Sequence, residues 1–231
     1  MLIVAHRGYS AAYPENTALA FERAIEAGAD FIETDVRFTR DGALVCSHDP
    51  DLKRVSGDPR AIAELDLAAI KEIELPRGQR VLELAEVLEI ARNRAGVMLD
   101  VKVTTPEMVE AIAQCLERTA MTSAVVFGAR SFDHLENISR RCEGLAILGM
   151  PKSPELAEAF LAHDVRAIRY WEDELNAERV KLVTGAGREV WVTAGSRPRQ
   201  EAPGYITQAR ARALAASGVN ALLVNDPTIG R

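Results

Sequence analysis

Cysteine is scarce in this sequence, and the few thiols follow no pattern that suggests chemistry. Three cysteines occur among 231 residues, far apart and without CxxC spacing. An odd number at such separations argues against a disulfide framework and against a thiolate metal or redox site. We therefore expect Cys46, Cys115 and Cys142 to be reduced thiols that are mostly buried in the core.

Long hydrophobic runs are missing as well. No window approaches the roughly 20 apolar residues that a membrane-spanning helix needs. The apolar stretch near the start covers only residues 2–5 before His6 and Arg7 interrupt it, which is shorter than the apolar segment of a signal peptide. We therefore expect a cytoplasmic protein without stable membrane insertion.

The sequence also lacks an excess of positive charge. Its 28 basic and 34 acidic residues give a formal net charge of -6, and no block rich in Lys and Arg occurs. Because nucleic-acid backbones attract basic surfaces, this balance argues against a general nucleic-acid-binding protein, although it allows a local basic pocket for one phosphate. With 48% hydrophobic and 27% charged residues, the composition is that of a globular chain that buries a sizeable core.

What the sequence does contain is a regular alternation of short β-branched runs and longer amphipathic segments. The runs predict strands near 2–5, 30–36, 43–47, 96–102, 124–128, 145–149, 166–169, 189–193 and 220–224. The amphipathic segments predict helices near 16–27, 82–94, 106–118, 132–141, 154–162, 176–184 and 207–217. Such an alternation indicates an α/β protein.

Eight strands remain if the 43–47 run extends the second strand. At this chain length, eight strands favour a compact (β/α)8 TIM barrel over an open doubly wound sheet. The segment from about 50 to 80 breaks the alternation with Gly57, Pro59, Pro76 and Gly78, and it predicts a small insertion over the barrel mouth. No linker divides the chain, so we expect a single domain over residues 1–231.

Acidic side chains occur in two predicted strands where apolar residues are the norm. Glu33 and Asp35 lie two residues apart and so project from the same face, and Asp100 and Lys102 repeat this spacing in the 96–102 strand. Buried carboxylates are costly unless a cation compensates their charge. An all-oxygen set suits Mg²⁺ or Ca²⁺ better than zinc, and an ion pair with Lys102 without any metal is the alternative.

Two histidines stand at the ends of predicted strands. His6 and Arg7 follow the apolar run at 2–5, and His48 follows the run at 43–47. His134 and His163 lie in polar helical segments, where we expect ordinary surface residues. The strand-end histidines are therefore the candidates for chemistry.

Together these residues match the needs of phosphodiester cleavage. Arg7, Lys102 and a divalent ion can hold the oxygens of a dianionic transition state. His6 and His48 can share the roles of general acid and general base, because the attacking oxygen loses a proton and the leaving alkoxide needs one.

An ordered series of motifs over residues 6–49 resembles the signature of the glycerophosphodiester phosphodiesterase family. The motifs are His6-Arg7-Gly8, Pro14-Glu15-Asn16-Thr17, Ala20-Phe21, Gly28-Ala29-Asp30, Ile32-Glu33-x-Asp35-Val36, Thr39-x-Asp41-Gly42 and His48-Asp49. Weaker similarities follow at the 84–88 helix, at Asp100-x-Lys102, at Ser131-Phe132, at Trp191 and in the closing segment 218–227. The resemblance thus covers nearly the whole chain.

The resemblance implies a TIM barrel that hydrolyses a small-molecule glycerophosphodiester to glycerol 3-phosphate and an alcohol with one divalent cation, Mg²⁺ or Ca²⁺. The roles it implies are acid–base catalysis for His6 and His48, metal binding for Glu33 and Asp35, and phosphate binding for Arg7 and Lys102. We add Asp100 as a third candidate metal ligand, and we take Glu15, Asn16, Phe132 and Trp191 as candidate pocket-lining residues.

The chain departs from the family at Asp100, where the family usually has a glutamate two residues before the lysine. A side chain one methylene shorter leaves three options for Asp100: no coordination, shifted coordination or a bridging water. Attack by the glycerol 2-hydroxyl through a cyclic phosphate and direct attack by water also stay open. Two further hypotheses are a related lyase, of the phospholipase D or phosphoinositide type, that stops at a cyclic phosphate, and a barrel that binds phosphodiesters without turnover.

Overall fold

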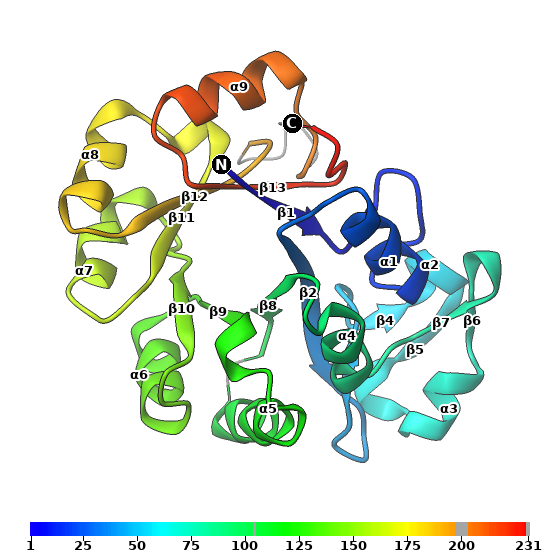
Figure 1. The fold of residues 1–231 in the computed structure, drawn as a ribbon. Helices are drawn as coiled ribbons and strands as arrows, with labels where there is room; N and C mark the ends of the chain where they lie inside the picture. Colours follow the sequence, from blue (N-terminus) through cyan, green and yellow to red (C-terminus); the bar gives the residue numbers. More distant parts are fainter. Residues whose placement is uncertain (104, 197–202, 230–231) are drawn as a thin grey trace.

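The computed structural model describes residues 1–103, 105–196 and 203–229, and its centre is a closed barrel of eight parallel strands (Figure 1). In order around the barrel these are β1 (Leu2–His6), β2 (Phe31–Phe38), β8 (Gly96–Val101), β9 (Val125–Ala129), β10 (Ala146–Gly149), β11 (Ala167–Trp171), β12 (Glu189–Thr193) and β13 (Ala221–Val224). The barrel closes because β1 pairs with both β2 and β13. The predicted (β/α)8 barrel is confirmed, and an open sheet is excluded.

Helices surround the strands and connect them in sequence (Figure 1). They are α1 (Ala18–Glu26), α4 (Leu84–Ala91), α5 (Pro106–Thr119), α6 (Phe132–Arg141), α7 (Ala157–Leu161), α8 (Ala177–Gly185) and α9 (Gln208–Ala216). Side-chain caps determine several starts: the Thr17 hydroxyl accepts from the Ala20 amide, and the Thr105 hydroxyl accepts from the Met108 amide. Among the described residues, no helix is both long and apolar enough to cross a membrane.

The excursion between β2 and α4 forms small elements of its own. After β3 (Leu44–Cys46), which pairs antiparallel with β2, come β4 (Asp51–Leu52), α2 (Lys53–Ser56), β5 (Asp58–Ala61), α3 (Leu67–Glu72), β6 (Glu74–Leu75) and β7 (Gln79–Arg80). A separate apolar cluster that includes Leu52, Ile62 and Ile70 holds them together. Figure 1 draws this segment beside the ring of strands, and Arg54 from α2 contacts Glu15 and Asp49.

The barrel interior changes from apolar to polar along each strand. Side chains that alternate by two residues face the same way. On β1 the inward residue Val4 is followed two positions later by His6, and on β8 Met98 is followed by Asp100. The apolar inward residues close one end of the barrel, and the polar ones meet at the carboxyl ends of the strands, where (β/α)8 enzymes place their active sites.

Trp191 lies in the apolar part of this interior and not near the mouth. Its indole ring packs edge-on against Phe31 at 5.5 Å between centroids, and its N–H donates to Glu189 at 2.8 Å. The expectation that Trp191 lines the pocket is therefore wrong. Trp191 lies two residues before Thr193 on the same face of β12, deeper in the barrel than the cavity. The three cysteines are free and buried, as predicted.

Candidate active site

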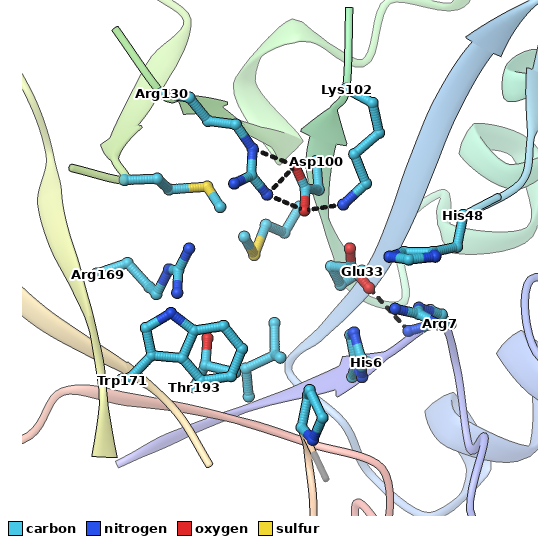
Figure 2. Close-up of a pocket in the computed structure, with 14 residues that line it drawn as sticks. His6, Arg7, Glu33, His48, Asp100, Lys102, Arg130, Arg169, Trp171 and Thr193 are labelled. Carbon is cyan, nitrogen blue, oxygen red and sulfur yellow. Dashed lines mark hydrogen bonds and ion pairs between the residues drawn. The ribbon is translucent and has the colours of Figure 1, made fainter. Parts of the chain in front are cut away.

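A cavity of about 250 Å³ opens at the carboxyl ends of the barrel strands (Figure 2). Its walls are polar residues that lie on or just after β1, β2, β3, β8, β9, β11 and β12, together with a few apolar ones. The lining residues are His6, Arg7, Glu33, His48, Met98, Asp100, Lys102, Arg130, Met150, Arg169, Trp171, Thr193, Pro203 and Leu223. The site thus brings together residues that are far apart in the sequence.

Three carboxylates meet at one side of this cavity. Oxygens of Glu33, Asp35 and Asp100 all lie within 4.8 Å of one another, and the three residues are buried. Burial raises the pKa of Glu33 well above its ordinary value, and the charges of Asp35 and Asp100 raise it further. A divalent cation would offset both the burial and the repulsion, so this oxygen donor set fits the hard metal ions predicted from the sequence.

Asp100 also has two basic partners. Its Oδ2 accepts from Lys102 Nζ at 2.6 Å, and the Arg130 guanidinium donates from Nε and Nη2 to Oδ1 at 3.0 and 2.7 Å. Burial raises the pKa of this carboxyl, but Lys102 and Arg130 outweigh burial and hold the pKa below its ordinary value. Both oxygens of Asp100 therefore already have charged donors.

Arg7 lies at the turn after β1 with a left-handed backbone, at φ 57°. Its amide donates to Glu33 Oε2 at 2.9 Å, its Nη1 donates to Glu15 Oε1 at 3.1 Å, and its Nε lies 3.3 Å from Asp35 Oδ2. The unusual backbone thus directs both the amide and the guanidinium of Arg7 at the acidic cluster. Glu15 in turn pairs with Arg54 at 2.6 Å.

His6 is held as a proton acceptor by its neighbour Asn225. The Nδ1 of His6 lies 2.7 Å from Asn225 Oδ1, and the amide group of Asn225 donates to the Pro203 carbonyl at 2.9 Å. Since Asn225 offers an oxygen, Nδ1 carries the hydrogen and Nε2 keeps a lone pair. Burial lowers the pKa of His6 to about 4, and the charge of Arg7 also lowers it, so the ring is neutral at pH 7.

His48 is positioned by charged neighbours. Its Nδ1 lies 2.8 Å from Asp49 Oδ1, and Asp49 Oδ2 accepts from Arg54 Nε at 2.6 Å. Arg37 donates to the His48 carbonyl through both Nε and Nη2. The His48 ring borders the cavity (Figure 2), and the Asp49 carboxylate holds it through Nδ1.

The structure places the remaining candidates outside the cavity wall. Glu15 and Asn16 contact the site through other residues: Glu15 pairs with Arg7, and Asn16 Nδ2 donates to Asp35 Oδ2 at 3.3 Å. Phe132 starts α6 and packs against Phe160 and His163. Contrary to expectation, it does not line the cavity. Its ring belongs to the packing between helices.

His134 is not the surface residue that its polar neighbours suggested. The side chain is fully buried on α6, and its ring packs edge-on against Phe127 at 5.1 Å. Burial lowers the pKa of His134 to about 4, and the charge of Arg130 lowers it as well. It is a neutral core residue.

Sequence reasoning did not identify Arg130, Arg169, Trp171, Thr193 and Asn225 as site residues. Two signals were available: Arg130 directly follows the β9 run, as Arg7 follows β1, and Arg169 interrupts the apolar β11 run Ala167–Trp171 with a charge. Arg169 is only 6% exposed, so its charge is inside the barrel.

The chain is similar in sequence to one family of phosphodiesterases. The model of the Glycerophosphoryl diester phosphodiesterase family matches residues 6–143. A Mycobacterium tuberculosis protein named "Probable glycerophosphodiester phosphodiesterase 1" is 50% identical over 72 residues, which is 31% of this chain and 26% of that protein. The glycerophosphodiester phosphodiesterase of Caldanaerobacter subterraneus is 30% identical over 157 residues, or 63% of this chain and 65% of that protein.

The crystal structure of glycerophosphodiester phosphodiesterase from Agrobacterium tumefaciens has a similar fold over the full chain. Its TM-score is 0.83 at 26% identity, and the match covers 100% of this chain and 99% of that one. The matched segments of the two sequence relatives span about a quarter and just under two thirds of their own lengths.

Proposed function

The chain belongs to the glycerophosphoryl diester phosphodiesterase family, and from this premise we propose that it hydrolyses glycerophosphodiesters to glycerol 3-phosphate and an alcohol. One observation carries the proposal. Two imidazoles, His6 and His48, border a cavity that also holds Arg7, Lys102 and an acidic cluster. Proton transfer, phosphate binding and metal binding are thus available within a single site.

In the proposed reaction, His6 is the general base. Its Nε2 lone pair accepts the proton of the attacking oxygen, and Asn225 keeps the ring in the required tautomer through Nδ1. His48 is the general acid that protonates the leaving alkoxide, and the Asp49 carboxylate holds its ring in position through Nδ1. The attacking oxygen belongs to water, which gives glycerol 3-phosphate directly, or to the glycerol 2-hydroxyl, which gives a cyclic phosphate that water then opens to glycerol 3-phosphate.

Arg7 and Lys102 bind the phosphate in this proposal. The Arg7 guanidinium offers a planar fork to two phosphate oxygens, and Lys102 offers a point charge. Glu33, Asp35 and Asp100 would hold one Mg²⁺ or Ca²⁺ ion, which would supply positive charge to the phosphate oxygens. Asp100 would have to exchange a contact with Lys102 or Arg130 to join the ligands.

A phosphorus NMR time course with glycerophosphoglycerol and glycerophosphocholine tests the proposal. We expect a growing monoester signal for glycerol 3-phosphate that exhaustive chelation with EDTA abolishes and added Mg²⁺ or Ca²⁺ restores. A cyclic diester that persists would identify a lyase, and an unchanged spectrum with measurable substrate binding would identify a binding protein. Turnover that survives chelation, with no metal found by elemental analysis, would contradict the metal part of the proposal.

A further inference from the structure

The wall of the cavity opposite the two histidines has its own charged residues. Arg130 follows β9, and Arg169 and Trp171 lie on β11, whereas His6, Arg7 and His48 belong to the β1 and β2 side (Figure 2). We call Arg130, Arg169 and Trp171 the β9–β11 wall. In the proposed function the phosphate binds at Arg7 and Lys102, so a substituent that filled the rest of the cavity would lie against this wall.

Arg130 presents positive charge to the cavity even though it binds Asp100. Its hydrogen bonds to Asp100 use Nε and Nη2, and no hydrogen bond of Nη1 to a described residue occurs. The guanidinium is positioned by three hydrogen bonds to one carboxylate, so it loses little further freedom when it binds an anion. Arg130 lines the cavity, and Figure 2 shows it on the opposite side of Asp100 from Lys102.

Arg169 determines what Trp171 can bind. The guanidinium carbon of Arg169 lies 5.1 Å from the centroid of the Trp171 ring, so a cation already covers one face of this ring. Quaternary ammonium groups are recognised by open aromatic faces. Trp171 is the sole Phe, Tyr or Trp among the described lining residues, so this wall suits a choline-like cation poorly.

The charge of the β9–β11 wall favours an anionic substituent. Two of the four cationic side chains among the described cavity-lining residues, Arg130 and Arg169, belong to this wall, and the two carboxylates among those lining residues, Glu33 and Asp100, lie on β2 and β8. A second anionic group on the substrate would therefore meet positive charge at this wall.

We propose that the β9–β11 wall selects glycerophosphodiesters whose alcohol carries a second anionic group, a phosphate or a carboxylate, over diesters of neutral or cationic alcohols. This inference rests on the proposed function and names the substrate class of the same site. Arg169 and Arg130 are the specificity-determining residues, because they are the cations of this wall.

Selectivity among matched diesters tests the inference. The panel consists of glycerophosphoglycerol, its terminal phosphate ester, the corresponding glycerophosphoglycerate and glycerophosphocholine, each assayed with saturating Mg²⁺ or Ca²⁺. We expect kcat/KM for the phosphate or the carboxylate diester to exceed that of glycerophosphoglycerol by about tenfold or more, with glycerophosphocholine lowest. The two anionic arms show which anion the wall prefers.

Variants of Arg169 on β11 and of Arg166, which directly precedes β11, separate the role of this wall from general effects of charge. Arg169→Met should reduce the preference for anionic over neutral diesters to less than about threefold. Arg166→Met removes an arginine that directly precedes β11 at the apolar end of the barrel, where Arg166 pairs with Glu189 and lies over Phe31 and Trp191. This control should keep the wild-type preference.

Wild-type selectivity decides the matter even if Arg169→Met fails to fold. Equal kcat/KM values across the panel, or a preference for the choline diester, would overturn the inference and leave the proposed hydrolysis intact. A preference that survives in folded Arg169→Met would also overturn it. Absence of turnover for every diester would overturn the proposed function and this inference with it.

Discussion

At the scale of single residues, His6 and His48 differ in the neighbour behind the ring, and each arrangement suits one proton transfer. Asn225 offers a neutral oxygen to His6 and Asp49 offers a carboxylate to His48. We predict that His6→Ala and His48→Ala each lower kcat by about 100-fold to 10,000-fold, since each removes a positioned proton carrier. Steady-state assays with glycerophosphoglycerol measure the loss, and circular dichroism checks that the fold is kept.

His163→Ala is the matched control for both variants. Its ring stacks on Phe132 outside the cavity, so this change should leave kcat within about twofold of wild type. Near-normal turnover in His6→Ala or His48→Ala would show that the corresponding imidazole is not a proton carrier.

Asp100 can bind a metal ion only in competition with its basic neighbours. Since Lys102 and Arg130 already bind both of its oxygens, a metal ion must compete with them. We predict that Asp100→Asn weakens Mg²⁺ and Ca²⁺ binding by about tenfold or more, whereas Asp100→Glu is tolerated and tightens Mg²⁺, which demands short and regular coordination. Isothermal titration calorimetry with each metal measures the affinities.

Asp66→Asn serves as the control, because Asp66 pairs with Arg40 on the surface and its loss should leave metal affinity unchanged. Equal affinities in wild type, Asp100→Asn and Asp100→Glu would place Asp100 outside the metal ligands. Its function would then be to position Lys102 and Arg130.

At the scale of elements, the turn between β1 and α1 depends on Gly8. This residue has φ +79°, and an added Cβ would lie 2.7 Å from the backbone carbon of Ala20 in α1. We predict that Gly8→Ala lowers the free energy of unfolding by roughly 2 to 5 kcal/mol, from left-handed strain together with the clash. Urea denaturation measures the change.

Gly57→Ala separates the two causes. Gly57 has a similar φ of +86°, but nothing lies within 4 Å of the added Cβ. The free energy of unfolding of this variant should fall only by the cost of left-handed strain, roughly 1 to 2 kcal/mol. Equal losses in both variants would show that the close approach of the turn to α1 does not matter for stability.

At the scale of the whole molecule, buried histidines make stability depend on pH. The pKa of His134 falls from 6.5 to about 4 on folding, so the unfolded chain binds more protons between these values. The free energy of unfolding therefore decreases as pH falls through this window, and it is retained above pH 6.5. We predict that His134 alone accounts for about 2 kcal/mol of the loss between pH 7 and pH 5.

Urea denaturation of wild type and His134→Gln at pH 7 and pH 5 measures this contribution. The variant should lose about 2 kcal/mol less than wild type over the same interval. Parallel curves for wild type and His134→Gln would contradict a neutral, buried His134.

The sequence by itself determined the order of strands and helices and the pairs of residues that share a strand face. A period of two identifies such pairs without knowledge of the neighbours, which is why Glu33 with Asp35 and Asp100 with Lys102 could be predicted. The two strand-end histidines were visible for a related reason, because polar residues stood directly behind apolar runs.

Only the tertiary structure decided which strands are neighbours and how deep each residue lies in the barrel. The pairing of β2 with β8 places Asp35 beside Asp100, and closure of the barrel brings Arg130 and Arg169 to the same cavity as His6. Depth separates Thr193, which lines the cavity, from Trp191 on the same face of the same strand. A repeat of two residues gives the direction of a side chain but not its distance from the mouth, because that distance depends on the stagger between strands that closes the barrel.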